Sequence, residues 1–190
     1  MILPIVKYGH PALRKKGERI EKVTPAIQEL IANMFETMYQ ASGVGLAAQQ
    51  VGLALQLTVL DVRAAKDRPS TLELEGKPAD VGAFMPLVLI NPQIRPFGDP
   101  VPGPEGCLSF PELYSDILRP ESVEVSALNA RGENVQFKAG GLLARAVQHE
   151  VDHLNGILFI DRMTNEDKSV LKPELEKLQT LTKAALKRAK

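Results

Sequence analysis

The chain has 190 residues, 44% hydrophobic and 24% charged, as is ordinary for a soluble globular protein. Its 23 basic and 23 acidic residues balance, so the net charge gives no reason to expect nucleic acid or an anionic membrane as a partner. A single cysteine, Cys107, excludes an intramolecular disulfide scaffold and fits a reducing, cytoplasmic location. Residues 1–6 lack the basic start and long apolar stretch of a signal peptide.

The N-terminal third is expected to contain an extended arm followed by a helix. Residues 1–23 favour an irregular, partly extended arm. Thr24 is a suitable helix cap and Pro25 suits the first helical position, and apolar residues then recur at helical spacing through Tyr39. The glycines of residues 42–45 end this helix.

The middle of the chain is expected to be mostly strands and loops. Residues 55–62 and 87–90 have the apolar, β-branched composition of strands. The intervening segment 64–83 is rich in charge, proline and glycine, which predicts a surface loop or a long hairpin tip. Four prolines and three glycines in residues 96–106 likewise predict a loop. Residues 123–138 predict two paired strands joined by a turn.

The C-terminal third predicts two helices. One runs from Leu142 to Leu154 and is stopped by the Asn-Gly pair that follows. A short apolar strand is expected at residues 157–160, and then a lysine-rich helix over residues 165–190, interrupted or restarted at Pro173. Central strands with helices on both sides indicate an α+β fold, with mixed or antiparallel sheets around the 142–154 helix.

Residues 149–153 carry the chemistry, since they read H-E-V-D-H, an H-E-x-x-H motif. On a helix, His149 and His153 lie on one face, where both rings can reach one cation, and Glu150 sits beside them to take a proton from water. Two solvent-facing histidines on a charged helix are the alternative. The apolar flanks argue against it, because they bury this helix, and buried histidines and glutamates are costly without partners.

A catalytic site of this kind needs a third protein ligand. The continuation after His153 places Phe159 where a third histidine would stand. The other histidine, His10, is in the N-terminal arm, and the downstream glutamates belong to a helix that reads as solvated. These glutamates are Glu166, Glu174 and Glu176.

Cys107 is the better third ligand, although a lone cysteine is more often an inert buried thiol. It follows Gly106, which allows a backbone to approach a metal closely. A thiolate and two neutral imidazoles suit iron(II), zinc, cobalt or nickel better than calcium or magnesium.

Residues 43–50, G-V-G-L-A-A-Q-Q, form the third notable feature. A phosphate-binding loop would require a further glycine and a lysine, and neither is present. The segment is either a helix-breaking turn followed by packed apolar residues, or a strand-like edge that pairs with an extended peptide. In the second case the side-chain amide of Gln50 would donate a hydrogen bond to a developing oxyanion.

Three segments resemble the three signature motifs of the peptide deformylases, in the family's order. They are G-V-G-L-A-A-Q-Q at 43–50, E-G-C-L-S at 105–109 and Q-H-E-V-D-H at 148–153. The arm at 9–14 and residues 154–162 also fit, so the resemblance covers nearly the whole chain. It implies a single catalytic domain over residues 1–164, with residues 165–190 as its C-terminal helical extension.

The resemblance also implies an activity and a role for each residue. The activity would be hydrolysis of the formyl group from the formyl-methionine of new polypeptides, with release of formate. Cys107, His149 and His153 would bind one divalent metal, iron(II) in the first place, with zinc, nickel or cobalt as alternatives in a purified sample. The remaining roles are these: Glu150 as general acid and base, Gln50 and the Leu108 amide as oxyanion donors, Gly45 as a backbone partner of the substrate, and Val44, Leu142 and Ala146 as the methionine pocket.

Two positions depart from the family's familiar pattern, Arg145 in place of an apolar pocket residue and Tyr114 in place of an arginine. Two rival functions are a general metallopeptidase and a metal-stabilised binding module without catalysis. The expected partner is a formylmethionyl peptide, with the ribosome as a further partner of the C-terminal helix, and no membrane or specific nucleic acid.

Overall fold

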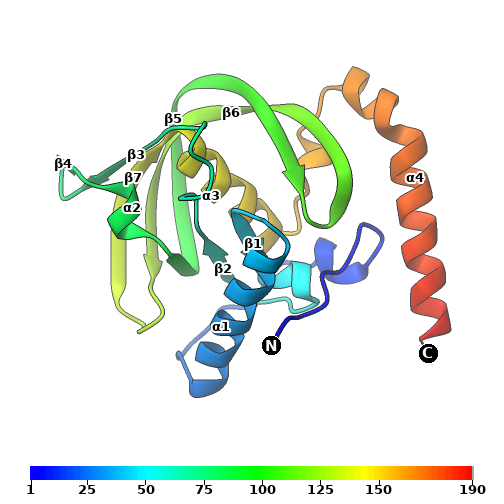
Figure 1. Ribbon diagram of the computed structural model, residues 1–190, viewed down its shortest axis with the longest axis horizontal. Coiled ribbons are helices and arrows are strands. Elements are labelled where there is room, and N and C mark those ends of the chain that lie inside the picture. The colour runs from blue at the N-terminus through cyan, green and yellow to red at the C-terminus, as the bar shows by residue number, and fades with distance from the viewer. Residues whose placement is uncertain (190) are drawn as a thin grey trace.

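The computed structural model describes residues 1–189, which form one antiparallel sheet and a set of helices, one of them central (Figure 1). The helices are α1 Pro25–Gln40, α2 Val81–Phe84, α3 Gly141–Leu154 and α4 Asn165–Arg188, with 3-10 turns η1 Pro11–Arg14, η2 Ala48–Val51 and η3 Phe159–Asp161. The strands are β1 Gly45–Ala47, β2 Leu57–Leu60, β3 Ser70–Leu74, β4 Lys77–Pro78, β5 Leu87–Cys107, β6 Phe110–Leu128 and β7 Asn134–Gly140. The predicted α+β class is confirmed.

The sheet has seven strands in the order β1-β2-β5-β6-β7-β3-β4. Every pair of neighbouring strands in this sheet is antiparallel, and a parallel pairing is found only outside it, in the isolated bridge between Glu18 and Leu55 among the described residues. The short strand β1 lies at one end of this order and pairs only on its β2 side, with Gly45 opposite Leu60. Its other edge is available for a further strand, as the edge reading of residues 43–50 requires.

Helix α1 forms where the capping signal predicted it. The Thr24 side chain accepts a hydrogen bond from the backbone N–H of Ile27, and Pro25 occupies the first turn. The apolar stripe of α1 buries Met34 and Met38 completely, against a cluster that includes Leu57 of β2. This packing fixes the chain immediately before the glycine-rich segment.

Helix α3 is the centre of the molecule (Figure 1). It contacts β1, β2, β3, β5, β6 and β7, and every residue from Leu142 to Leu154 is buried. Its apolar residues pack with Leu89, Val123 and Phe137 of the sheet. The prediction of a buried helix carrying the H-E-x-x-H motif is therefore confirmed, and the polar side chains of α3 must find partners inside the protein.

The predicted loop at residues 96–106 is wrong, because β5 continues through it to Cys107. Over this stretch β5 pairs with β6, with register shifts at Phe97/Pro100 and Gly106/Cys107, whereas its pairing with β2 is confined to residues 87–90. Alternate residues of a strand direct their N–H groups to opposite edges, so prolines at 100, 102 and 104 fall on the edge that has no partner strand. The prolines therefore suit an edge strand.

Two further details differ from expectation in the C-terminal third. Residues 157–160 form no strand, because Phe159 and Ile160 belong to the 3-10 turn η3. Leu158, Phe159 and Ile160 are buried, and the Asp161 side chain accepts a hydrogen bond from the N–H of Leu158, which precedes the turn. Helix α4 runs through Pro173 without interruption. Only Leu175 of α4 is buried, and the predicted extension over 165–190 ends with Lys190, which lies outside the described residues.

Of the two alternatives for the segment 64–83, the hairpin is the one that forms, since the segment contains the antiparallel pair β3 and β4 and the start of α2. Strand β3 pairs with β7, so the hairpin extends the main sheet. Helix α3 has no side-chain cap of its own at Gly140, and the residues leading into β3 supply one. The carbonyl of Pro69 accepts from the N–H of Leu142, and Ser70 Oγ accepts from the N–H of Leu143, each at 3.0 Å.

No helix within residues 1–189 combines the length and apolar character required to cross a bilayer.

Candidate metal centre and catalytic cleft

The structure brings the three predicted ligands together. One turn of α3 separates His149 from His153, whose ring centroids lie 5.0 Å apart, and Cys107 reaches them from the end of β5. Cys107 Sγ lies 3.3 Å from His153 Nε2, and the potential ligand atoms of all three residues lie within 4.8 Å of one another. The arrangement confirms the predicted Cys-His-His metal site.

The donor set fits a divalent transition metal. Two ligand atoms on one tetrahedral ion lie about 3.5 Å apart, given metal–sulfur and metal–nitrogen bonds of about 2.3 Å and 2.0 Å. The Sγ–Nε2 separation is close to this value without any rearrangement. His149 Nδ1 is engaged by Glu105 at 2.9 Å, which leaves Nε2 of that ring for a cation. Three protein ligands leave a fourth position open for water or substrate.

The rejected third ligands lie elsewhere. His10 Nδ1 accepts a hydrogen bond from the N–H of Ala12 and caps η1. Phe159 is buried with its ring centroid 6.1 Å from that of His149, so it packs beside the site as an apolar wall. The glutamates at 166, 174 and 176 are exposed on α4. Cys107 is therefore the ligand that completes the site.

A buried charge network supports the ligands, and the sequence analysis did not assign it. Glu105 accepts from His149 Nδ1, from Arg119 Nε and Nη2, and from Arg145 Nη1. Arg119 also donates to Asp152, which lies on α3 between the two histidines. The exposed fractions of the Glu105 and Arg119 side chains are only 4% and 3%, so the pair is removed from solvent. Both acids of the network, Glu105 and Asp152, stand inside the quoted motifs. No local pattern, however, indicates the pairing of Glu105 with His149, which lies 44 residues further along the chain.

The network sets the charge states of the two histidines. Burial opposes ionisation of Glu105, but the hydrogen bonds from His149 and Arg119 keep the pKa of its carboxyl below the usual range. Burial also disfavours a charged His149, yet Cys107 and Glu105 raise the pKa of that ring well above its usual value. Burial and the charge on His149 together lower the pKa of His153. His153 is therefore neutral, as a metal ligand must be, and a cation would displace a proton from His149.

Glu150 lies directly against the glycine-rich strand. Its carboxylate is buried, and Oε2 is 3.5 Å from the Thr58 hydroxyl of β2. A Cβ atom on Gly45 would lie 2.4 Å from Glu150 Oε1, so this approach of β1 to the carboxylate requires glycine. Burial raises the pKa of Glu150 to about 7, although the charge on His149 acts in the opposite direction. The carboxylate is thus poised to exchange protons near neutral pH.

Gln50 is held with its amide nitrogen toward Cys107. Its Oε1 accepts from the N–H of Ala47, and its Nε2 lies 3.4 Å from both Cys107 Sγ and Ser109 Oγ. The N-terminal arm braces both walls of this region, since the N–H of Val6 donates to the Gln50 carbonyl and Lys7 Nζ donates to the Leu108 carbonyl. No local sequence pattern indicates this contribution of the arm.

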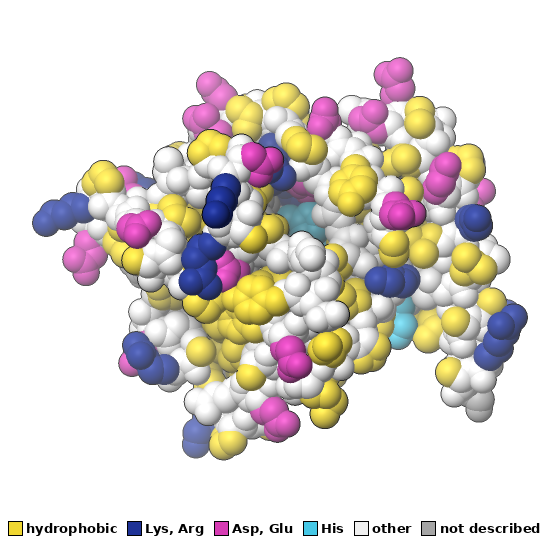
Figure 2. All heavy atoms as spheres, viewed as in Figure 1, with side chains coloured by type: hydrophobic (Ala, Val, Ile, Leu, Met, Phe, Trp, Pro, Cys, Tyr) yellow, Lys and Arg dark blue, Asp and Glu magenta, His cyan; other side chains and the backbone are white. Residues whose placement is uncertain are grey.

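The predicted catalytic and substrate-contacting residues share one cleft of about 600 Å³. Its lining includes Val44, Gly45, Gln50, Cys107, Leu108, Leu142, Ala146, His149 and Glu150. Figure 2 shows histidine atoms within a hollow near the middle of the molecular face. The protein thus gathers these residues at one accessible place, although their individual roles remain predictions.

The two unusual positions have separate explanations. Arg145 is buried with its guanidinium turned to Glu105 and to the carbonyls of Val101 and Ile117, so it ties α3 to the β5–β6 hairpin. Tyr114 is 69% exposed and also lines the cleft. A Cβ atom on Gly106 would meet the Tyr114 ring at 2.5 Å, so glycine lets the ring lie across the strand beside Cys107.

Comparisons with known proteins agree on one family. The family model described as Polypeptide deformylase matches residues 2–169. A peptide deformylase of Methylacidiphilum infernorum is 48% identical over 179 residues, covering 94% of this chain and 94% of that protein. The chloroplastic/mitochondrial peptide deformylase 1B of Arabidopsis thaliana is 41% identical, covering 93% of this chain and 60% of that protein. A crystal structure of a Synechococcus elongatus peptide deformylase in complex with actinonin superimposes with a TM-score of 0.74 at 40% identity, covering 95% of this chain and 85% of that one.

Replacing Glu105 by glutamine tests the buried network. Glu105→Gln removes the charge that two arginines and His149 share, so we expect a loss of about 3–5 kcal/mol in the free energy of unfolding. Because His149 also loses its orienting partner, affinity for a divalent metal should fall about 10- to 100-fold. Urea unfolding and competition against a chelator measure the two effects.

The matched control is Glu124→Gln, because Glu124 pairs with the exposed Arg95 on the outer part of the sheet. An exposed ion pair is weakened by solvent screening, and the ion-pair partners of Glu124 are Arg95 and Lys138 rather than a metal ligand, so this variant should fold and bind metal as the unaltered protein does. Unchanged metal affinity in the folded Glu105→Gln protein would contradict the supporting role of Glu105.

Proposed function

The chain belongs to the polypeptide deformylase family, and from this premise we propose which of its residues carry out the hydrolysis and which metal they use. It is a metallo-hydrolase with peptide deformylase activity, which converts a formylated peptide and water to formate and a free amine. The single observation that supports the assignment of roles is the convergence of Cys107, His149 and His153 beside a buried Glu150.

When bound by Cys107, His149 and His153, a divalent cation would supply a Lewis acid that polarises the formyl carbonyl and acidifies water. Glu150 is the general base and takes the proton of the attacking water, whose oxygen forms a bond to the formyl carbon. As the carbon–nitrogen bond breaks, Glu150 returns the proton to the leaving amine. A pKa near 7 favours both halves of this exchange, and contact with Gly45 holds the carboxylate at the edge of β1.

The oxyanion that develops on the formyl oxygen is stabilised by two donors, Gln50 Nε2 and the backbone N–H of Leu108. Support comes from the fixed orientation of the Gln50 amide, whose oxygen is held by Ala47 so that its nitrogen faces the Cys107 side of the cleft. Ser109 and the N-terminal arm hold the Leu108 segment in place. Donors that are already oriented stabilise developing charge without a reorganisation cost.

The substrate lies extended along the free edge of β1. There the backbone of Gly45 pairs with the peptide, in the manner of an added strand. Val44, Leu142 and Ala146 form the pocket for the methionine side chain, which agrees with their shared position on the cleft lining. The small residues Gly45 and Ala146 leave room for the substrate backbone and the methionine side chain to approach the metal ligands.

Iron(II) is the proposed metal, with zinc, nickel or cobalt as substitutes. One thiolate and two imidazoles form a donor set that accepts any of these ions and disfavours calcium or magnesium. The preference for iron(II) within this group rests on resemblance to the family.

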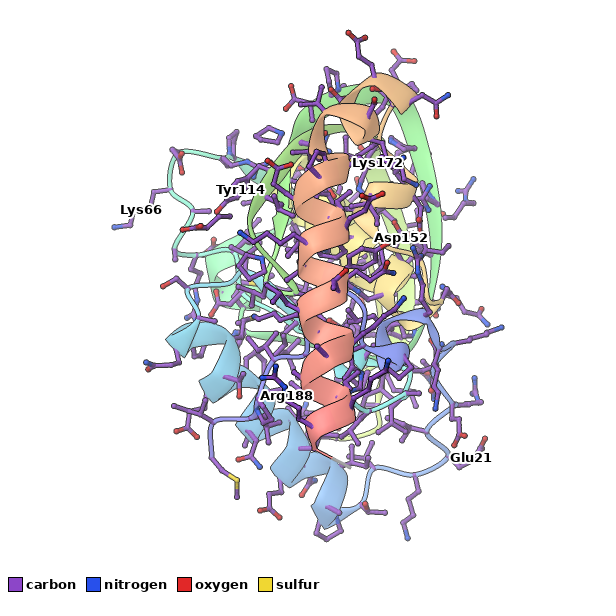
Figure 3. All side chains as sticks on the ribbon, turned by 90° about the vertical axis from the view of Figure 1, so that its right-hand side faces the viewer. Glu21, Lys66, Tyr114, Asp152, Lys172 and Arg188 are labelled. Atoms are coloured by element: carbon purple, nitrogen blue, oxygen red, sulfur yellow. The ribbon has the colours of Figure 1, made fainter. Side chains whose placement is uncertain are left out.

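A cytoplasmic location and contact between α4 and the ribosome also remain proposals. For α4 the support is its exposure and the basic residues of its last turn, Lys187 and Arg188. In Figure 3, Lys172 and Arg188 lie near opposite ends of this exposed helix.

The substrate is tested with three peptides that differ at the amino group. We expect strong formate release from formyl-Met-Ala-Ser, and little hydrolysis of acetyl-Met-Ala-Ser or of unblocked Met-Ala-Ser. The protein should be purified without oxygen and its metal quantified in the same sample, before and after chelation. Comparable cleavage of the unblocked peptide would favour a general metallopeptidase. Unfolding on chelation, with no hydrolysis of any peptide, would favour a metal-stabilised binding module.

Gln50→Leu tests the oxyanion donor. The variant should fold and retain its metal but lose about 3–4 kcal/mol of transition-state stabilisation, or a factor of about 10² to 10³ in kcat. Gln49→Leu is the matched control, because Gln49 is adjacent and buried, but its amide bonds the Lys15 and Leu154 carbonyls away from the cleft. It should lose stability and keep the turnover of its folded fraction. Near-normal kcat in Gln50→Leu would refute the role of Gln50.

Glu150→Gln tests the general base and its pH dependence. The variant should bind metal and lose most of its turnover, because the amide cannot accept the proton of water. In the unaltered enzyme the base is active only when ionised, so activity should fall as pH drops through the pKa of Glu150. Burial places that pKa at about 7, and a bound cation would lower it further, so the acid limb should lie below pH 7. An active Glu150→Gln enzyme would exclude this role.

A further inference from the structure

The segment that leads into β3 holds one arginine at the catalytic cleft. Pro69 and Ser70 are bonded to the first turn of α3, through the N–H groups of Leu142 and Leu143. Pro69 also lies close enough that a Cβ on Gly141 would meet its carbonyl oxygen at 2.2 Å. Arg68 immediately precedes this anchored pair, so its backbone position is set by the same helix that carries the metal ligands.

Arg68 is a cation of the cleft lining that has no role in the proposed hydrolysis. Its side chain is half-buried and belongs to the cleft lining together with Val44 and Leu142. Within residues 1–189 its guanidinium makes neither an ion pair nor a hydrogen bond. The other cations on the lining are engaged, Arg145 by Glu105 and Lys7 by the Leu108 carbonyl. A guanidinium held at a cleft wall with free donors is suited to bind a carboxylate.

We propose that Arg68 is a specificity-determining residue that binds an acidic side chain on the third residue of the formylated peptide. The inference rests on the proposed function, in which the substrate lies extended along β1 with its methionine between Val44 and Leu142. In an extended chain, side chains one and three point to the same side, about 7 Å apart. Arg68 lines the cleft together with Leu142, and the Pro69 carbonyl that follows it accepts a hydrogen bond from the Leu142 N–H. Arg68 therefore borders the methionine pocket, and the third side chain is the one that extends toward it.

A second charged residue of the cleft, Glu112, confines the expected preference for an acidic side chain to the position beside Arg68. Glu112 on β6 is exposed and lines the cleft, and it forms no ion pair with Arg68 within the described chain. A carboxylate near Glu112 would be repelled, so the cleft as a whole has no general attraction for acidic peptides. An ion pair that stays partly exposed contributes about 0.2–1 kcal/mol, which corresponds to a preference of up to about fivefold.

The experiment compares four-residue formyl peptides that differ only in the third residue. Formyl-Met-Ala-Xaa-Ala amides, with Glu, Gln or Lys as Xaa, are assayed by formate release. The C-terminal amide removes the carboxylate of the chain end. The unaltered enzyme should favour Glu over Gln by about two- to fivefold in kcat/KM, mostly through KM, and Lys should be the poorest. The preference should shrink at high salt, because a partly exposed pair is screened.

Two substitutions of Arg68 and one control separate the charge from the scaffold. Arg68→Gln should abolish the preference for Glu, and Arg68→Glu should invert it in favour of Lys. Lys66→Gln is the matched control, because Lys66 lies two residues away in the same segment and projects away from the body of the protein (Figure 3). Lys66→Gln changes the net charge by the same amount as Arg68→Gln and should retain the preference for Glu. Metal content and thermal unfolding are measured for every variant.

Several results would overturn the proposal. The first is a preference for Glu that persists in Arg68→Gln. The second is the absence of any preference for Glu in the unaltered enzyme. The third is a loss of rate in Arg68→Gln that is equal for all three peptides. A preference that appears only with free-acid peptides would assign Arg68 to the chain end instead of a side chain, and would also overturn it. Failure of the proposed function is a distinct outcome, since the unaltered enzyme would then release no formate from any peptide.

Discussion

The carboxylate of Glu105 is the contact on which the arrangement of the site depends. It lies at the end of β5, two residues before Cys107, and it holds a ring nitrogen of His149 on α3. The same carboxylate therefore sets the distance between the strand that supplies sulfur and the helix that supplies nitrogen. Arg119 and Arg145 balance its charge in the interior, where an unpaired carboxylate would be strongly disfavoured. The network orients the ligand that it supports.

The second constraint is the close approach of the β1 backbone, at Gly45, to the carboxylate of Glu150. Gly45 lets β1 pass against this carboxylate. Strand β1 is an edge strand of the sheet, at the end next to β2, so one of its edges is unpaired. The general base, the free strand edge and the metal ligands consequently lie in one cleft. In such an arrangement an extended peptide can place its terminal group beside the metal while its backbone is held by hydrogen bonds. The fold thus couples substrate positioning to the placement of the base.

Local signals predicted the parts of this structure that depend on local interactions. The Thr24 cap, the apolar spacing of α1 and the H-E-x-x-H helix all formed as expected, and Cys107 could be selected because two histidines lacked a third ligand. The continuation of β5 through residues 96–107 could not be predicted, because its prolines suit both a loop and a strand edge without a partner. The Glu105 network and the contact of Pro69 with α3 join distant segments, so no sequence spacing indicates them.

The central claim is that one divalent cation is held by Cys107, His149 and His153, and cobalt(II) titration of the metal-free protein tests it most directly. Cobalt bound to a thiolate gives a sulfur-to-metal charge-transfer band, and Cys107 is the only cysteine, so the band reports this one ligand. We expect the band to saturate at one cobalt per chain and to disappear in Cys107→Ser, while Glu150→Gln retains it. Stoichiometric binding without the band, or a band that survives in Cys107→Ser, would contradict the account.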